Sequence, residues 1–119
     1  SPYMAAVRHI IEDLGGQVVR LRHDEPTVLP RMKGFIDLLF LFEGKYYILD
    51  WKMNYLFEYS PISLQKAMDE HQYTLQAKIY KEALKSHLTS HKKPFNELFG
   101  GTIYFFLRGK EQGVYNCYG

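Results

Sequence analysis

The sequence contains a single cysteine, no long hydrophobic run and no strong excess of either charge. One thiol, Cys117, excludes an internal disulfide and a four-cysteine iron–sulfur cluster. No stretch has the length of a membrane span and none has the pattern of a signal peptide, so we expect a cytoplasmic protein without membrane attachment. The net charge of +2 is too small to indicate nucleic-acid binding by itself.

The 119 residues do contain enough apolar material for one folded domain. Hydrophobic residues make up 46% of the chain and charged residues 24%, which is typical of a globular protein. We expect most of the tyrosine and phenylalanine rings to lie in the core, although such rings also stack on nucleic-acid bases. The chain begins at Ser-Pro and ends just after a strand-like run, so we expect it to be a fragment of a larger polypeptide.

Hydrophobic periodicity predicts the order α-β-β-β-α-β-β. A helix between the third and fourth strands requires a right-handed crossover and a parallel pair. The predicted fold class is therefore α/β, with three layers and a central mixed β-sheet. Ser60 followed by Pro61, or Ser63, is expected to cap the second helix. The helices are predicted at 3–14 and 62–88, and the strands at 17–23, 33–42, 45–52, 101–107 and 114–118.

The most informative stretch is a predicted hairpin whose two-residue turn is Glu43-Gly44. If Phe42 faces Lys45, counting back along both strands places Asp37 opposite Asp50. Side chains alternate between the faces of a strand, so Lys52 projects from the same face as Asp50. The rest of both faces is apolar, which predicts interior strands that are covered on both sides.

Two opposed carboxylates in apolar surroundings repel each other unless one is protonated or both share a cation. Mg²⁺ fits such a site because it binds one or two carboxylates together with water and phosphate. Lys52 would add a positive charge for a phosphate or a developing oxyanion. The pattern indicates metal-assisted phosphodiester chemistry. The alternative is that Asp37 and Asp50 lie at strand ends and face water, and a three-residue turn would move them out of register.

Two weaker signals have an ordinary structural explanation beside a functional one. His9 lies beside the apolar face of the first helix, and we favour a half-buried histidine over a ligand. Arg20 and Arg22 share one face of the first strand, which is a solvated edge or a contact for the DNA backbone. The loop after the hairpin is expected to expose three aromatic rings: Tyr55, Phe57 and Tyr59.

Three segments, in order, resemble the RecB-like nucleases of the PD-(D/E)XK superfamily: GFIDLLFLFEGKYYILDWKMN, AMDEHQYTLQAKIY and FGGTIYFFLRG. The resemblance covers about residues 33–109 and implies a restriction-endonuclease-like fold, with residues 1–119 as a single nuclease domain. It implies that Asp37, Asp50 and Lys52 are catalytic. It also implies that Asp37 and Asp50 bind Mg²⁺ and that the backbone carbonyl of Trp51 completes the metal shell.

A second set of residues is shared with this family on the long predicted helix. Tyr73, Gln76 and Tyr80 lie on one helix face, which by itself is the margin of an ordinary amphipathic helix. Gln76 and Tyr80 match the Gln-x-x-x-Tyr motif of the RecB-like nucleases. The resemblance implies that they lie next to the active site, where they position the DNA strand or brace the site.

The family also implies a biological setting. It is that of a bacterial, cytoplasmic helicase–nuclease of the exodeoxyribonuclease V type, which acts in double-strand break repair and recombination. Its partners are DNA, RecC- and RecD-like subunits and RecA, while the helicase motor and ATP site lie outside these residues. The alternative is a catalytically silent nuclease-fold module that docks a protein or DNA, and the intact acidic pair argues against it.

The sequence departs from the family pattern in places that bear on activity. Met53 stands where the family has serine, which removes a hydroxyl near the site, whereas Trp51 in place of tyrosine keeps an aromatic ring on the opposite face. The metal-binding histidine of the family lies on a helix far upstream of the first aspartate, and His9 matches neither its position nor its neighbours. We therefore expect these residues alone to bind metal weakly and to cleave DNA poorly.

Overall fold

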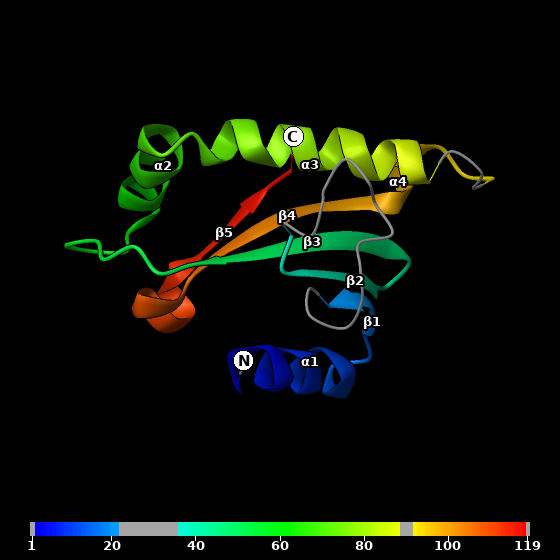
Figure 1. Cartoon of the computed structure of the whole chain (residues 1–119), viewed down its shortest axis with the longest axis horizontal. Coiled ribbons are helices and arrows are strands. Elements are labelled where there is room, and N and C mark those ends of the chain that lie inside the picture. The colour runs from blue at the N-terminus through cyan, green and yellow to red at the C-terminus, as the bar shows by residue number, and fades with distance from the viewer. Residues whose placement is uncertain (1, 22–35, 89–91, 119) are drawn as a thin grey trace.

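The computed structural model describes residues 2–21, 36–88 and 92–118. A five-stranded mixed sheet, in the order β1-β2-β3-β4-β5, lies between α1 on one face and α2 and α3 on the other (Figure 1). This three-layer α/β architecture confirms the expected fold class and is consistent with a restriction-endonuclease-like fold. The elements are α1 (Pro2–Asp13), β1 (Gln17–Leu21), β2 (Leu38–Phe42), β3 (Lys45–Lys52), α2 (Pro61–Glu70), α3 (Tyr73–His87), α4 (Phe95–Leu98), β4 (Phe99–Phe106), the 3₁₀ helix η1 (Leu107–Gly113) and β5 (Val114–Cys117).

The hairpin of β2 and β3 has the turn and the register that the sequence predicts. Glu43 and Gly44 have φ angles of 49° and 80°, as a two-residue turn with two positive φ values requires. Antiparallel pairing runs from Phe42 opposite Lys45 back to Leu38 opposite Leu49. Strand β2 begins at Leu38, so the first aspartate lies one residue before it, and residues 33–35 of the expected strand lie outside the described part of the chain.

Strands β3 and β4 are parallel, as the helical crossover between them requires. Asp50 of β3 stands beside Tyr104 of β4, and Lys52 stands beside Phe106. The carboxyl ends of both strands therefore meet at one edge of the sheet. In open α/β sheets this edge is where ligands bind.

Helices cover both faces of β2 and β3, which makes these strands interior as expected. On one face, Leu39 and Ile48 pack in a buried cluster with side chains of α3. On the other face, Leu38 and Leu49 belong to a cluster that Val7 and Ile11 of α1 complete. The polar residues at the carboxyl end of β3 thus lie on the face that α3 covers.

The single helix predicted over 62–88 is wrong, because the chain forms α2 and α3 with a break at His71 and Gln72. Gln72 adopts left-handed backbone angles, φ 57° and ψ 30°, which cost a residue other than glycine roughly 1–2 kcal/mol. Neither glycine nor proline marks the break in the sequence. Helix α2 itself begins as predicted, since Pro61 is its first residue and the Ser60 hydroxyl accepts the amide of Ser63 at 3.3 Å.

Two smaller expectations are also wrong. His9 is exposed rather than half-buried, and its imidazole lies 3.3 Å from Asp13 on the next turn of α1. Tyr59 is half-buried, whereas Tyr55 and Phe57 are exposed as predicted.

The side chains of Arg20 and Arg22 lie outside the described part of the chain. No helix within the described ranges is both long and apolar enough to span a membrane.

Candidate active site

Asp37 and Asp50 meet on the α3 side of the sheet, where the hairpin register places them. Their residues are 3% and 4% exposed, so both carboxyl groups are buried. Asp37 accepts the backbone N–H of Trp51 through Oδ2 at 3.0 Å. This hydrogen bond holds the Asp37 side chain against β3. The two carboxyl groups also share a hydrogen bond. The alternative in which they face water at separate strand ends does not hold in this structure.

This environment raises the pKa of Asp50 from its ordinary value of 3.8 to about 8. Burial is the largest cause, the hydrogen bond and the negative charge of Asp37 add to it, and Lys52 opposes it. At neutral pH Asp50 is therefore protonated and donates to Asp37. A cation placed between the two groups would displace that proton, because metal ligands must be deprotonated.

Lys52 lies on the same face as Asp50, and its Nζ is 3.5 Å from Asp50 Oδ2. The ammonium group is also 4.2 Å from the centre of the Tyr73 ring and 5.5 Å from that of Tyr104. An ammonium group over an aromatic face is stabilised by the ring quadrupole. Tyr73 in turn donates its hydroxyl to Asn54 Oδ1 at 3.1 Å, which links the start of α3 to the end of β3.

Tyr104 is a member of the site that sequence reasoning missed. It is fully buried next to Asp50, its ring stacks on Tyr73, and its hydroxyl donates to Gln76 Oε1 at 2.7 Å and lies 3.2 Å from the Tyr73 carbonyl. Burial, followed by the charge of Asp50, raises the pKa of Tyr104 well above its ordinary value. The hydroxyl therefore stays a hydrogen-bond donor and holds the Gln76 side chain in one orientation.

We expect Tyr104→Phe to lower the free energy of unfolding by about 1 kcal/mol, because Gln76 Oε1 loses its donor in a partly buried place. The phenylalanine ring keeps the stacking on Tyr73. Urea denaturation measures the change, with Tyr118→Phe, an exposed tyrosine, as the matched control that should stay unchanged. Equal stability of Tyr104→Phe and the parent chain would contradict the role of the hydroxyl.

The other predicted residues occupy supporting positions. Tyr80 is buried in the cluster that contains Leu39 and Ile48, so it is a core residue on the α3 side of the sheet. The Trp51 side chain packs on the opposite face, with the residues that contact α1, as expected for an aromatic at this position. Of the predicted set, Asp37, Asp50, Lys52, Tyr73 and Gln76 form one connected group, and Tyr80 lies behind it.

The acidic pair fits a hard divalent cation in its donor type and in its electrostatics. Asp50 Oδ2 is buried and forms no close hydrogen bond, and its charged neighbour is the Lys52 ammonium group at 3.5 Å, so the oxygen retains a lone pair for a ligand. Carboxylate oxygens are the ligands that Mg²⁺ prefers. Within 2–21, 36–88 and 92–118, no three His, Cys, Asp or Glu side chains gather into a metal-binding group. In this part of the chain the carboxylates of Asp37 and Asp50 are thus the two ligands that the site offers.

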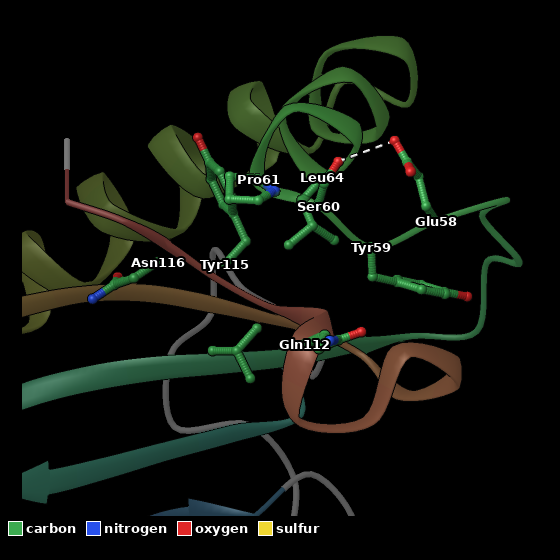
Figure 2. Close-up of a pocket in the computed structure, with 9 residues that line it drawn as sticks. Glu58, Tyr59, Ser60, Pro61, Leu64, Gln112, Tyr115 and Asn116 are labelled. Atoms are coloured by element: carbon green, nitrogen blue, oxygen red, sulfur yellow. Dashed lines mark hydrogen bonds between the residues drawn. The ribbon is translucent and has the colours of Figure 1, made fainter.

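A cavity of about 590 Å³ lies apart from the acidic pair, between the loop after β3, the start of α2 and β5 (Figure 2). Its one acid, Glu58, accepts the hydroxyls of Ser60 and Ser63 at 3.3 and 3.2 Å, and Figure 2 shows it turned toward Ser60. The carboxylate is therefore engaged at the first turn of α2. The cavity contains none of the predicted site residues, and its lining is Glu58, Tyr59, Ser60, Pro61, Leu64, Gln112, Val114, Tyr115 and Asn116.

Comparison with known proteins finds relatives of one kind, whereas no family model matches the sequence. The chain is 42% identical over 95 residues to the RecBCD enzyme subunit RecB of Escherichia coli K12, a match that covers 71% of this chain and 8% of that protein. RecB of Borreliella burgdorferi is 40% identical over 87 residues, or 70% of this chain and 7% of that protein. RecB of Haemophilus influenzae is 32% identical over 120 residues, or 90% of this chain and 10% of that protein. The chain thus spans a tenth or less of the length of these relatives.

Proposed function

This chain is homologous to a segment of the RecB subunit, and we propose that it forms the Mg²⁺-dependent DNA nuclease domain of a RecBCD-type helicase–nuclease. One observation carries the proposal. Two buried carboxylates, Asp37 and Asp50, share a hydrogen bond at the end of β3, with the Lys52 ammonium group 3.5 Å from Asp50. Burial of two acids and a cation at a strand end opposes stability, and such groups concentrate at functional sites.

In this proposal Asp37 and Asp50 would hold Mg²⁺, and the backbone carbonyl of Trp51 would add a third oxygen. When bound, Mg²⁺ would supply charge neutralisation at the phosphate and lower the pKa of a water molecule. The Trp51 amide holds Asp37 in position through the 3.0 Å hydrogen bond. Asp50, once deprotonated, faces the site with the oxygen that lacks a hydrogen bond.

Lys52 is the group that meets the substrate in this arrangement. Its ammonium group orients the attacking water and stabilises negative charge on the phosphate oxygens. The rings of Tyr73 and Tyr104 hold the lysine side chain over the acidic pair, at 4.2 and 5.5 Å from its nitrogen. Gln76 contributes an amide at the edge of the site, and Tyr80 supports α3 from the core.

The homology also suggests the setting in which the domain works. We propose that it acts on DNA together with RecC- and RecD-like subunits in double-strand break repair and recombination, and that RecA is a further partner. RecB of Escherichia coli is named as a subunit of the RecBCD enzyme, which supports the first two partners.

Three measurements test the proposal. Calorimetry with Ca²⁺ on the 119-residue chain should show weak binding that Asp50→Ala abolishes, and Mg²⁺-dependent DNA cleavage by the chain alone should be slow. Robust cleavage by the chain, lost in Asp50→Ala, would contradict the predicted weakness. Replacing the matched segment of Escherichia coli RecB by these residues within RecBCD should restore full nuclease activity. An inactive chimera together with absent Ca²⁺ binding would contradict the nuclease assignment and favour a catalytically silent docking module.

A further inference from the structure

The loop between β3 and α2 places two aromatic rings in solvent next to the acidic site. Tyr55 is 72% exposed and Phe57 is 95% exposed. Leu56, between them, is half-buried and packs against the cluster that includes Leu64 and Phe106. The loop is therefore fixed through its middle residue, while the rings on either side remain uncovered.

The conformation of this loop is set by Tyr59. Its hydroxyl accepts the amide of Leu56 at 3.1 Å and lies 3.3 Å from the Asn54 carbonyl oxygen, so it bridges the two ends of the turn. The Tyr59 ring packs closely on Gly109, where an added Cβ would lie 2.5 Å from a ring carbon. Because the loop is ordered before it meets a partner, binding to its rings costs little conformational entropy.

The loop is continuous with the acidic site. Tyr55 is three residues beyond Lys52, so their Cα atoms are at most about 11 Å apart. Asn54, between them, accepts the Tyr73 hydroxyl at 3.1 Å and so belongs to the site itself. In Figure 1 the loop projects beyond the end of the sheet, on the side where β3 ends. A strand whose phosphate lies at Lys52 would pass next to this loop.

Two exposed cations lie beside the loop. Arg108 is exposed and donates through Nε to the Met53 carbonyl at 2.8 Å, and Lys110 of η1 is exposed as well. Two exposed acids accompany them, Glu58 in the loop and Glu111 of η1, and the Glu58 carboxylate accepts the Ser60 hydroxyl. Cations beside flat apolar rings are the combination with which proteins hold the phosphates and the bases of a single strand.

We propose that Tyr55 and Phe57 form a stacking platform for the unpaired bases of a DNA strand that enters the site at Lys52. The inference rests on the proposed nuclease function and adds two residues that hold the substrate strand beside the acidic site. Inside a duplex each base pair is stacked between its neighbours, so it offers no free base face to these rings. The platform therefore discriminates for unpaired DNA.

Fluorescence anisotropy with a labelled oligothymidylate tests the platform, in EDTA so that cleavage plays no part. Phe57→Ala and Tyr55→Ala should each weaken binding about fivefold or more, whereas Phe57→Trp should retain it and Phe57→Leu should not. The matched control is Tyr118→Ala. Tyr118 is 75% exposed and lies with Phe99 at the opposite end of β4, so its removal should leave binding unchanged.

Two further ligands separate stacking from other causes. On an abasic oligonucleotide of equal length, and on a blunt duplex, the Phe57 and Tyr55 variants should bind as the parent chain does. Ring substitutions without effect on oligothymidylate, an equal loss on the abasic ligand, or undetectable binding by the parent chain would overturn the platform. A dimer of the parent chain that Phe57→Ala dissociates would assign the rings to a second copy and also overturn it. Ring-dependent binding together with an inactive RecB chimera and absent Ca²⁺ binding would leave the platform standing while the nuclease assignment fails.

Discussion

Asp50→Asn is expected to make the protein more stable at pH 8 and to abolish Ca²⁺ binding at the same time. The pKa of Asp50 is raised to about 8 in the folded protein, from an ordinary value of 3.8. Between those two values the unfolded chain carries the charged group while the folded chain keeps the proton. Stability of the parent therefore falls as the pH rises from about 4 to about 8, by up to tenfold in the folding constant per pH unit. Above pH 8 both states are ionised and the loss stops.

Asparagine does not ionise, so the stability of the variant does not fall in this way as the pH rises. Urea denaturation gives the free energy of unfolding of both proteins from pH 4 to pH 9. Plotted against pH, the two free energies should be equal near pH 4, diverge as the pH rises and differ by a constant amount above pH 8. Asp69→Asn, which replaces an exposed acid on α2, is the matched control measured over the same pH range. Asp50→Asn less stable than the parent at pH 8 would show that the acid supports the fold and does not strain it.

Ca²⁺ provides the second readout on the same pair of proteins. A ligand that binds the folded state stabilises it in proportion to its binding, so saturating Ca²⁺ should raise the stability of the parent and leave Asp50→Asn unchanged. A substitution that raises stability but removes metal binding is typical of a site that is kept for function at a cost in stability. Stabilisation of both proteins by Ca²⁺ would place the metal elsewhere.

The hairpin could be predicted because its turn chemistry determines its register. Glu43-Gly44 permits two positive φ values, and this sets which residues face each other along the whole of β2 and β3. The juxtaposition of Asp37, Asp50 and Lys52 follows from that register alone. No long-range information was needed, since all three lie within one hairpin.

The contribution of β4 could not be predicted, because it depends on pairing between segments that are far apart in the sequence. A crossover through α2 and α3 determines that β3 and β4 are parallel, but it leaves their relative register open. The neighbour of Asp50 could have been any inward residue of β4, and it is Tyr104. The break at Gln72 was hidden as well, because a left-handed glutamine has no sequence signal, and this break is what starts α3 at Tyr73, over the lysine.

Lys52→Met is expected to separate metal binding from catalysis. The ammonium group lies 3.5 Å from Asp50 Oδ2, so it repels any cation bound by that carboxylate. It also lowers the pKa of Asp50, and its removal raises that pKa above about 8. At pH 9.5 the proton on Asp50 competes less than at pH 7, so loss of the repulsion should have its largest effect there and Ca²⁺ should bind several-fold more tightly. At pH 7 the proton on Asp50 competes more strongly, and the gain should shrink or reverse.

Cleavage should fall at every pH. Without the ammonium group, negative charge on the phosphate loses its protein partner, and removal of one such group costs about a hundredfold or more in rate. The measurement is Mg²⁺-dependent DNA degradation by the RecB chimera described above, with Lys52→Arg as the variant that keeps the charge. Calorimetry at pH 7 and 9.5 measures the effect of the substitution on the affinity for Ca²⁺. If Lys52→Met weakens metal binding and cleavage together at pH 9.5, the lysine acts by positioning the carboxylates. If binding improves while cleavage is lost, it acts on the substrate, as its place between Asp50 and the Tyr73 ring indicates.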